Sequence, residues 1–92
     1  MIFKLSTEIQ QEIAKKAKNL RKQYKLTQSD LAEQCGVTLS SLKRFEQSGK
    51  ISLSSLLKIA QRLDALEDFE RLFSKRKKTP GSIDEILKKE QE

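Results

Sequence analysis

The chain has 92 residues with a net charge of +6, no histidine and a single cysteine, Cys35. This composition excludes Ser-His-Asp and Cys-His catalytic sites, Cys/His zinc sites and disulfide-stapled secreted scaffolds. No apolar run approaches the roughly 20 residues of a membrane span, so a cytoplasmic, non-enzymatic protein without cofactor or metal, and with no membrane partner, is the leading class.

The positive charge is unevenly distributed along the chain. Residues 1–25 and 74–92 carry a basic excess, whereas residues 26–50 are neutral overall. A basic excess attracts polyanions such as nucleic acid or an anionic surface, and a solvated, solubilising face is the alternative.

The first predicted helix begins at Thr7, which fits a capping box with Gln10, and residues 2–5 before it are a candidate short strand. Apolar side chains recur every three or four positions and form one stripe, made of Ile9, Ile13, Ala17, Leu20 and Tyr24. The opposite face is basic and holds Lys15, Lys18 and Lys22.

Two short helices are predicted next. Thr27 caps a helix over residues 28–35 that buries Leu31 and Ala32, and Gly36 ends it in a left-handed conformation. Thr38 caps a helix over residues 39–47, which Gly49 ends in the same way. The inward side chains of this helix are Leu42 and Phe45.

Two further helices complete the predicted core. Ser52 begins the fourth, whose expected inward side chains are Leu53, Leu56, Leu57, Ala60 and Leu63. The fifth covers residues 66–73, with an apolar set of Leu66, Phe69, Leu72 and Phe73. The expected fold is therefore all-α, with five helices in a domain of residues 1–73.

Residues 74–92 form a separate tail in this prediction. A basic run at 75–78 is followed by Thr79-Pro80-Gly81, which marks a turn. Ser82 and Glu85 then fit a capping box ahead of three apolar residues, Ile83, Ile86 and Leu87. A helix this short is marginal in water, so the tail is expected to be flexible or ordered by a partner.

The second and third predicted helices form a helix-turn-helix, with the sequence LTQSDLAEQCGVTLSSLKRFE. Ala32 is small where the two helices must cross closely, and Gly36 supplies the tight turn. Such a unit places its second helix in the major groove of DNA.

This stretch resembles the Cro/repressor-type (XRE) helix-turn-helix family. The matching segments are LTQSDLAEQCGV, SSLKRFE and SLSSLLKIAQRL, and the resemblance covers roughly residues 20–73. It implies a five-helix domain that binds a double-stranded DNA operator with inverted repeats, as a homodimer. A helix-turn-helix kept only for packing is the alternative.

The resemblance implies a set of DNA-contacting positions: Gln28, Thr38, Leu39, Ser40, Ser41, Lys43, Arg44, Gln47, Ser48 and Lys50. Gln28 is expected at phosphate, as are Ser48 and Lys50 in the loop after the third helix. Lys43 and Arg44 can donate to guanine, with phosphate contact alone as the alternative. Leu39 departs from the polar residue frequent in the family, and it either meets a thymine methyl or packs inward.

The resemblance also implies an ion pair between Glu46 and Arg21, which fixes the recognition helix without touching DNA; an exposed Glu46 is the alternative. Cys35 is expected to fill a small apolar site beside Gly36, with a redox switch as the less favoured interpretation.

A longer stretch, SSLKRFEQSGKISLSSLLKIAQRLDALEDFERLF, is similar to small XRE proteins paired with Hip-type kinase toxins. That similarity implies an antitoxin that also represses its own operon, with a kinase-like toxin as partner. The alternatives are a stand-alone phage-type or housekeeping repressor, and an antitoxin acting mainly on its partner.

Overall fold

The computed structural model describes residues 4–74, which contain five helices and no strand. The helices are α1 (Ser6–Gln23), α2 (Gln28–Cys35), α3 (Leu39–Ser48), α4 (Leu53–Arg62) and α5 (Leu66–Glu70). The all-α, five-helix prediction is confirmed. Of the candidate strand at residues 2–5, only Lys4 and Leu5 are described, and neither is in a strand.

α1 begins earlier than its sequence predicts. Its N-cap is Leu5, and the Glu8 carboxylate accepts a hydrogen bond from the Leu5 N–H at 3.4 Å. The predicted cap at Thr7 with Gln10 is therefore wrong. A glutamate three residues after the N-cap satisfies a free N–H of the first turn, and this bond places the helix start at Ser6.

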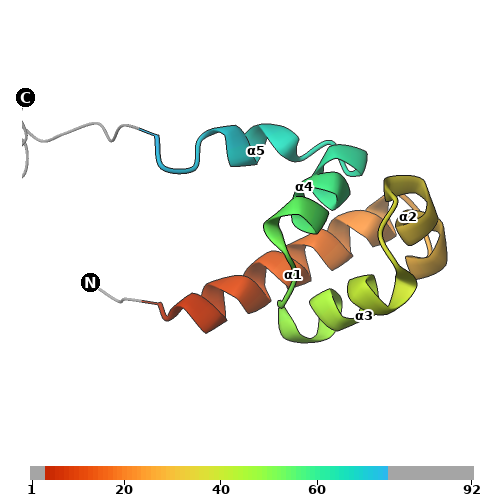
Figure 1. The fold of residues 1–92 in the computed structure, drawn as a ribbon, viewed down its shortest axis with the longest axis horizontal. Helices are drawn as coiled ribbons and strands as arrows, with labels where there is room; N and C mark the ends of the chain where they lie inside the picture. The colour runs from red at the N-terminus through yellow and green to blue at the C-terminus, as the bar shows by residue number, and fades with distance from the viewer. Residues whose placement is uncertain (1–3, 75–92) are drawn as a thin grey trace, which may run out of the picture.

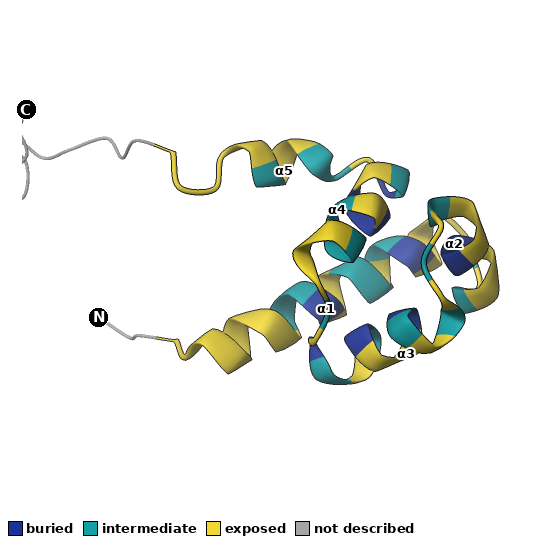
Figure 2. Ribbon diagram, in the orientation of Figure 1, coloured by how far each residue is buried: buried dark blue, intermediate teal, exposed yellow. Residues whose placement is uncertain are grey.

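The first two turns of α1 contribute no side chain to the core. Residues 4–11 are all exposed, and the buried stripe of α1 starts at Ile13 rather than Ile9 (Figure 2). At the other end, Tyr24 lies after the helix and is exposed, with its hydroxyl donating to Asp64 at 3.1 Å. The predicted stripe is therefore correct only in its middle part.

The capping residues of α2 and α3 agree with the prediction, although α3 ends one residue later than predicted, at Ser48. The hydroxyl oxygens of Thr27 and Thr38 accept N–H groups of the following turn at 3.0 and 3.1 Å. Gly36 and Gly49 end the helices with φ of 76° and 81°, in the left-handed region. Gly49 also touches α1, because a Cβ atom at this position would lie 2.7 Å from the carbonyl carbon of Gln10.

The core lies where α1 to α4 meet. Its fully or nearly fully buried members are Ala14, Leu31, Ala32, Leu42, Phe45, Ile59 and Leu63. The predicted inward side chain Leu53 is instead 62% exposed, whereas Ile59, absent from the predicted set, is 1% exposed. α4 therefore differs from the prediction at Leu53 and Ile59, whereas the predicted inward residues Ala60 and Leu63 are buried and Leu56 packs against the core.

α5 is shorter than predicted and ends at Glu70, followed by a turn. Leu72 and Phe73, predicted inside this helix, lie after it and are exposed, and Phe73 has a φ of 59°. The short tail helix predicted after Ser82 and the basic run at 75–78 lie outside the described residues. Within residues 4–74, no helix has the length and apolar character to cross a membrane.

Figure 1 shows how these elements are arranged. α1 runs the length of the molecule, α3 packs across it, and α2 packs on both α3 and α4. α5 contacts α4 and leads the chain back toward the end where α1 begins. The helix-turn-helix is thus held at one end of the molecule, and the described segment, residues 4–74, begins and ends at the other (Figure 1).

Candidate nucleic-acid interface

α3 has one buried side and one exposed side. Its inward residues Leu42 and Phe45 are each 1% exposed and pack with Leu31 and Ala32 of α2. The exposed positions of α3 are Ser40, Lys43, Arg44 and Gln47. Because these four recur at three- and four-residue intervals, they form one outward polar face.

An ion pair anchors α3 from behind. Arg21 Nε donates to Glu46 Oε2 at 2.8 Å, and Arg21 Nη2 donates to Glu46 Oε1 at 3.1 Å. The third Arg21 nitrogen, Nη1, donates to the carbonyl oxygen of Leu26 at 2.8 Å. The two side chains are 9% and 3% exposed. The structure therefore has the ion pair that the resemblance implies, and the alternative of an exposed Glu46 is wrong. This guanidinium therefore ties α1, the α1–α2 turn and α3 together.

Gln28 belongs to the same cluster. Its Nε2 atom donates to Glu46 Oε1 at 2.9 Å, so this carboxylate oxygen accepts from both Arg21 and Gln28. The amide oxygen and the second N–H of Gln28 are the atoms left for a ligand. Sequence reasoning missed this bond because nothing in the spacing of two residues 18 positions apart indicates a contact.

A shallow concavity of about 600 Å³ lies beside the exposed face of α3. It is lined by Thr38, Ser40, Ser41, Arg44, Lys50, Ile51 and Ser52. Thr38 and Ser52 are the N-caps of α3 and α4, so two positive helix ends border the same hollow as two cationic side chains. This combination suits an anion such as a phosphate group.

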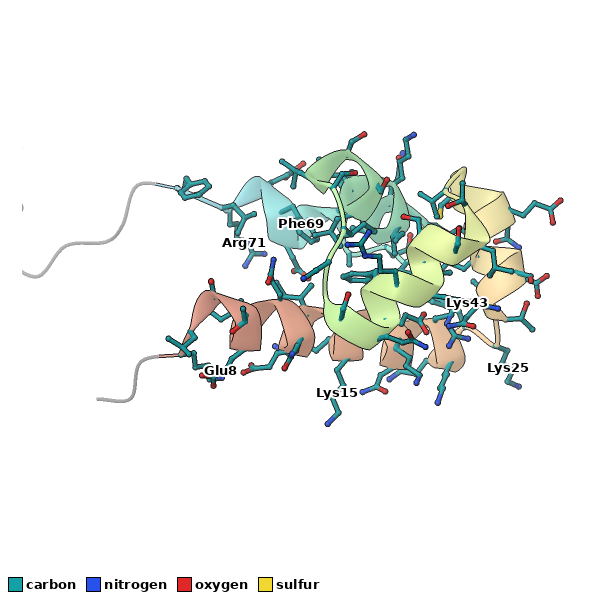
Figure 3. All side chains as sticks on the ribbon, turned by 60° about the horizontal axis from the view of Figure 1, so that its bottom comes forward. Glu8, Lys15, Lys25, Lys43, Phe69 and Arg71 are labelled. Carbon is teal, nitrogen blue, oxygen red and sulfur yellow. The ribbon has the colours of Figure 1, made fainter. Side chains whose placement is uncertain are left out.

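The structure therefore brings five predicted residues to the concavity and adds Ile51 and Ser52 to them. The sequence signal for Ser52 was its role as a cap, because an N-cap residue lies beside the free N–H groups of its helix. Lys43 and Gln47 lie elsewhere on the outward face of α3, as Figure 3 shows for Lys43.

Two residues predicted to contact DNA, Leu39 and Ser48, have a structural role within the domain. Leu39 is half-buried and packs against the core, which favours the packing interpretation over thymine recognition. Ser48 is the last residue of α3 rather than part of the following loop. Its hydroxyl donates to the Arg44 carbonyl at 2.7 Å and accepts the Lys50 N–H at 3.1 Å, so it orders that loop.

Two further basic side chains, Lys15 and Lys25, are exposed outside α3. Figure 3 shows Lys15 of α1 and Lys25 of the α1–α2 turn projecting outward along the edge below Lys43.

Cys35 is half-buried at the end of α2 and packs against the core, as expected. Among residues 4–74, no group of three or more His, Cys, Asp or Glu side chains is placed to hold a metal ion.

Comparison with known proteins places this arrangement in a family. The helix-turn-helix family model HTH_3 matches residues 18–69, which is more than half of the chain and contains all of α2, α3 and α4. No curated protein matches the chain. The buried α2–turn–α3 unit with an outward polar helix face, together with this match, shows that the chain belongs to the XRE-type helix-turn-helix family of DNA-binding transcriptional regulators.

Proposed function

We propose that the protein is a repressor that binds an inverted-repeat operator in double-stranded DNA as a homodimer, in the cytoplasm of a prokaryotic cell. Residues 1–73 form the DNA-binding domain in this proposal, and residues 74–92 are a separate tail. The observation that carries the proposal is the outward face of α3, where Ser40, Lys43, Arg44 and Gln47 are exposed while the opposite side is buried.

In the proposed complex, α3 enters the major groove with its N-terminal half nearest the bases. Arg44 and Lys43 donate to guanine O6 and N7, and Ser40 reaches a neighbouring base edge. A backbone phosphate lies in the concavity, where Lys50 and the N–H groups at the starts of α3 and α4 donate to it. Specificity then rests on a few placed side chains, since residues 26–50 are neutral overall.

Gln28 has a double role in this proposal. One N–H of its amide is used on Glu46, and its second N–H and the α2 N-terminus are available to a phosphate on the other side of the groove. Glu46 belongs to α3 and is itself held by Arg21. Its hydrogen bond to Gln28 therefore fixes the position of the Gln28 phosphate contact relative to α3.

The test is footprinting of the full chain on its own promoter, followed by affinity measurements on the protected site. We expect two protected half-sites whose centres are about 34 Å apart, one turn of DNA. Arg44→Ala should weaken binding to the operator by about 1–3 kcal/mol and relax specificity at one base position. The matched control is Lys58→Ala, which removes an exposed positive charge from α4 outside the concavity. Absence of protection, or equal losses for both variants, would contradict base readout by Arg44.

Salt dependence tests the phosphate contacts separately. The logarithm of the affinity should fall with the logarithm of the salt concentration, by about 0.9 per phosphate neutralised. Lys50→Ala should weaken binding equally on all sequences and reduce this slope by about one. A slope unchanged by Lys50→Ala would remove that residue from the phosphate contacts.

A second candidate function is that of the antitoxin of a Hip-type toxin–antitoxin operon. The observation that favours it is the apolar end of the LEDFERLF segment, where Leu72 and Phe73 are exposed and offer a surface to a kinase-like toxin. The gene next to this one should then encode such a kinase, and the two proteins should co-purify. Without either result, the stand-alone repressor is the remaining interpretation.

A further inference from the structure

An apolar groove runs between α1 and α5, on the side of the molecule away from the helix-turn-helix. It has a volume of about 260 Å³, and α4 forms its floor. Its principal lining residues are Ile13, Ala17, Leu20, Leu63, Phe69 and Leu72. Phe69, labelled in Figure 3, contributes from α5, and the exposed Leu72 stands at the open end.

The two rims of this groove carry opposite charges. Lys16 lies on the α1 rim and Asp68 on the α5 rim, and both line the hollow with the apolar residues. An apolar cavity of about 150 Å³ holds a benzene-sized group, so this groove has room for a few aliphatic side chains but not for a domain. An occupant should therefore be a narrow apolar stripe with an acid on one side and a base on the other.

We propose that the occupant is this chain's own C-terminal segment, residues 82–89. As a helix, this segment places Ile83, Ile86 and Leu87 on one stripe, at the i, i+3, i+4 spacing. At 100° per residue, Asp84 and Lys89 fall on opposite flanks of that stripe. The segment therefore matches the groove in apolar width and in the signs of both flanks, with Asp84 toward Lys16 and Lys89 toward Asp68.

The connection between groove and segment is long enough. The described chain ends at Ser74, two residues after Leu72 of the groove. Eight residue steps separate Ser74 from Ser82, and at about 3.3 Å per step they reach roughly 26 Å. The helix α5, Leu66–Glu70, is only about 7.5 Å long at 1.5 Å per residue, so the segment can turn at Pro80-Gly81 and lie along the groove.

Two arguments favour this occupant over a second copy of the folded domain. A two-fold contact brings a surface against itself, and a hollow facing an identical hollow does not fill it. A segment tethered by a short linker also has an effective local concentration near the millimolar range. Docking would cover Phe69 and Leu72, so a protein partner that needs these side chains must first displace the tail. This inference does not depend on DNA binding.

Paramagnetic broadening in the full-length, isotope-labelled chain tests the proposal. Cys35→Ala removes the native thiol, and Lys88→Cys, outward from the stripe, carries a nitroxide label. We expect the strongest loss of amide signal at Ala17 and Leu63 and the weakest at Lys43, which lies on the outward face of α3. Ile86→Asp in the labelled chain should restore the lost signals, whereas Thr79→Asp, which adds the same side chain in the linker, should not.

The remaining outcomes overturn the proposal. Intact Ala17 and Leu63 signals in the labelled chain would mean that the segment does not dock, as would broadening that persists with Ile86→Asp. A mixture of isotope-labelled chain without nitroxide and unlabelled chain with nitroxide tests for exchange between molecules. Broadening in that mixture would show that a second copy supplies the tail. Unchanged Leu31 and Leu42 shifts in every variant serve as the check that the domain remains folded.

Discussion

Removing the carboxylate at position 46 should severely destabilise the domain. In Glu46→Ala, Arg21 loses two charge-assisted hydrogen bonds, of 2.8 and 3.1 Å, and Gln28 loses one. Arg21 keeps only its bond to the Leu26 carbonyl, at a position where its side chain is 9% exposed in the native domain. Leaving one charge of a buried pair without its partner costs about 3–5 kcal/mol, a large part of the roughly 5–15 kcal/mol that stabilises a small domain.

Urea unfolding followed by circular dichroism measures this loss. With a typical dependence of about 1–3 kcal/mol per molar urea, the midpoint of Glu46→Ala should fall by more than about 1 M. The double variant Arg21→Met/Glu46→Leu should recover most of the loss, because an apolar pair of similar volume has no desolvation cost. The control is Glu67→Ala, whose partner Arg71 is 3.4 Å away in an exposed pair, with an expected change below about 0.5 kcal/mol.

A loss below about 1 kcal/mol for Glu46→Ala would refute this reasoning, because that is the range of solvent-exposed pairs. A double variant as unstable as the single one would show that packing around the two side chains, rather than the unpaired charge, determines the loss.

Two further predictions concern the backbone and the single tyrosine. Gly49→Ala should destabilise the domain by more than Gly36→Ala. Both substitutions force an alanine into a left-handed φ, which costs about 1–2 kcal/mol, but only at Gly49 does the Gln10 backbone lie 2.7 Å from the new Cβ. Equal urea midpoints for the two variants would refute that contact. The hydrogen bond to Asp64 raises the pKa of the Tyr24 hydroxyl above its ordinary value, so Asp64→Asn should lower this pKa. Ultraviolet absorbance can follow the titration because the chain has one tyrosine and no tryptophan, and an unchanged titration would mean that this hydrogen bond contributes nothing in solution.

Local signals predicted the helix-turn-helix most accurately. Thr27, Thr38, Gly36 and Gly49 each act within one turn of their helix, so their effect can be read from neighbouring residues. α4 shows the limit, because its apolar residues cover a wide arc and periodicity alone does not select which part turns inward. In the structure the buried residues of α4 are Ile59 and Ala60 in its C-terminal half, and Leu53, one of the five predicted inward residues, is exposed at the first position of the helix.

The candidate interface was predictable only where it depends on local helical spacing. The outward positions of α3 follow from helical spacing, but the arrangement around Glu46 depends on contacts between segments 18 and 25 residues apart. The resemblance supplied the Arg21 partner, whereas the Gln28 bond required the structure. The concavity could not be predicted from the sequence either, because it forms only where the loop after α3 brings Ser52 beside Thr38.

The two sides of α3 have consequences for how this protein can change over time. Leu42, Phe45 and Glu46 hold the helix, whereas Ser40 and Lys43 are exposed and do not belong to the core cluster. Exposed substitutions generally alter stability by less than about 0.5 kcal/mol, so the outward positions are free to vary under selection. A new target sequence could therefore evolve by drift at a few surface codons, without passing through an unfolded intermediate variant.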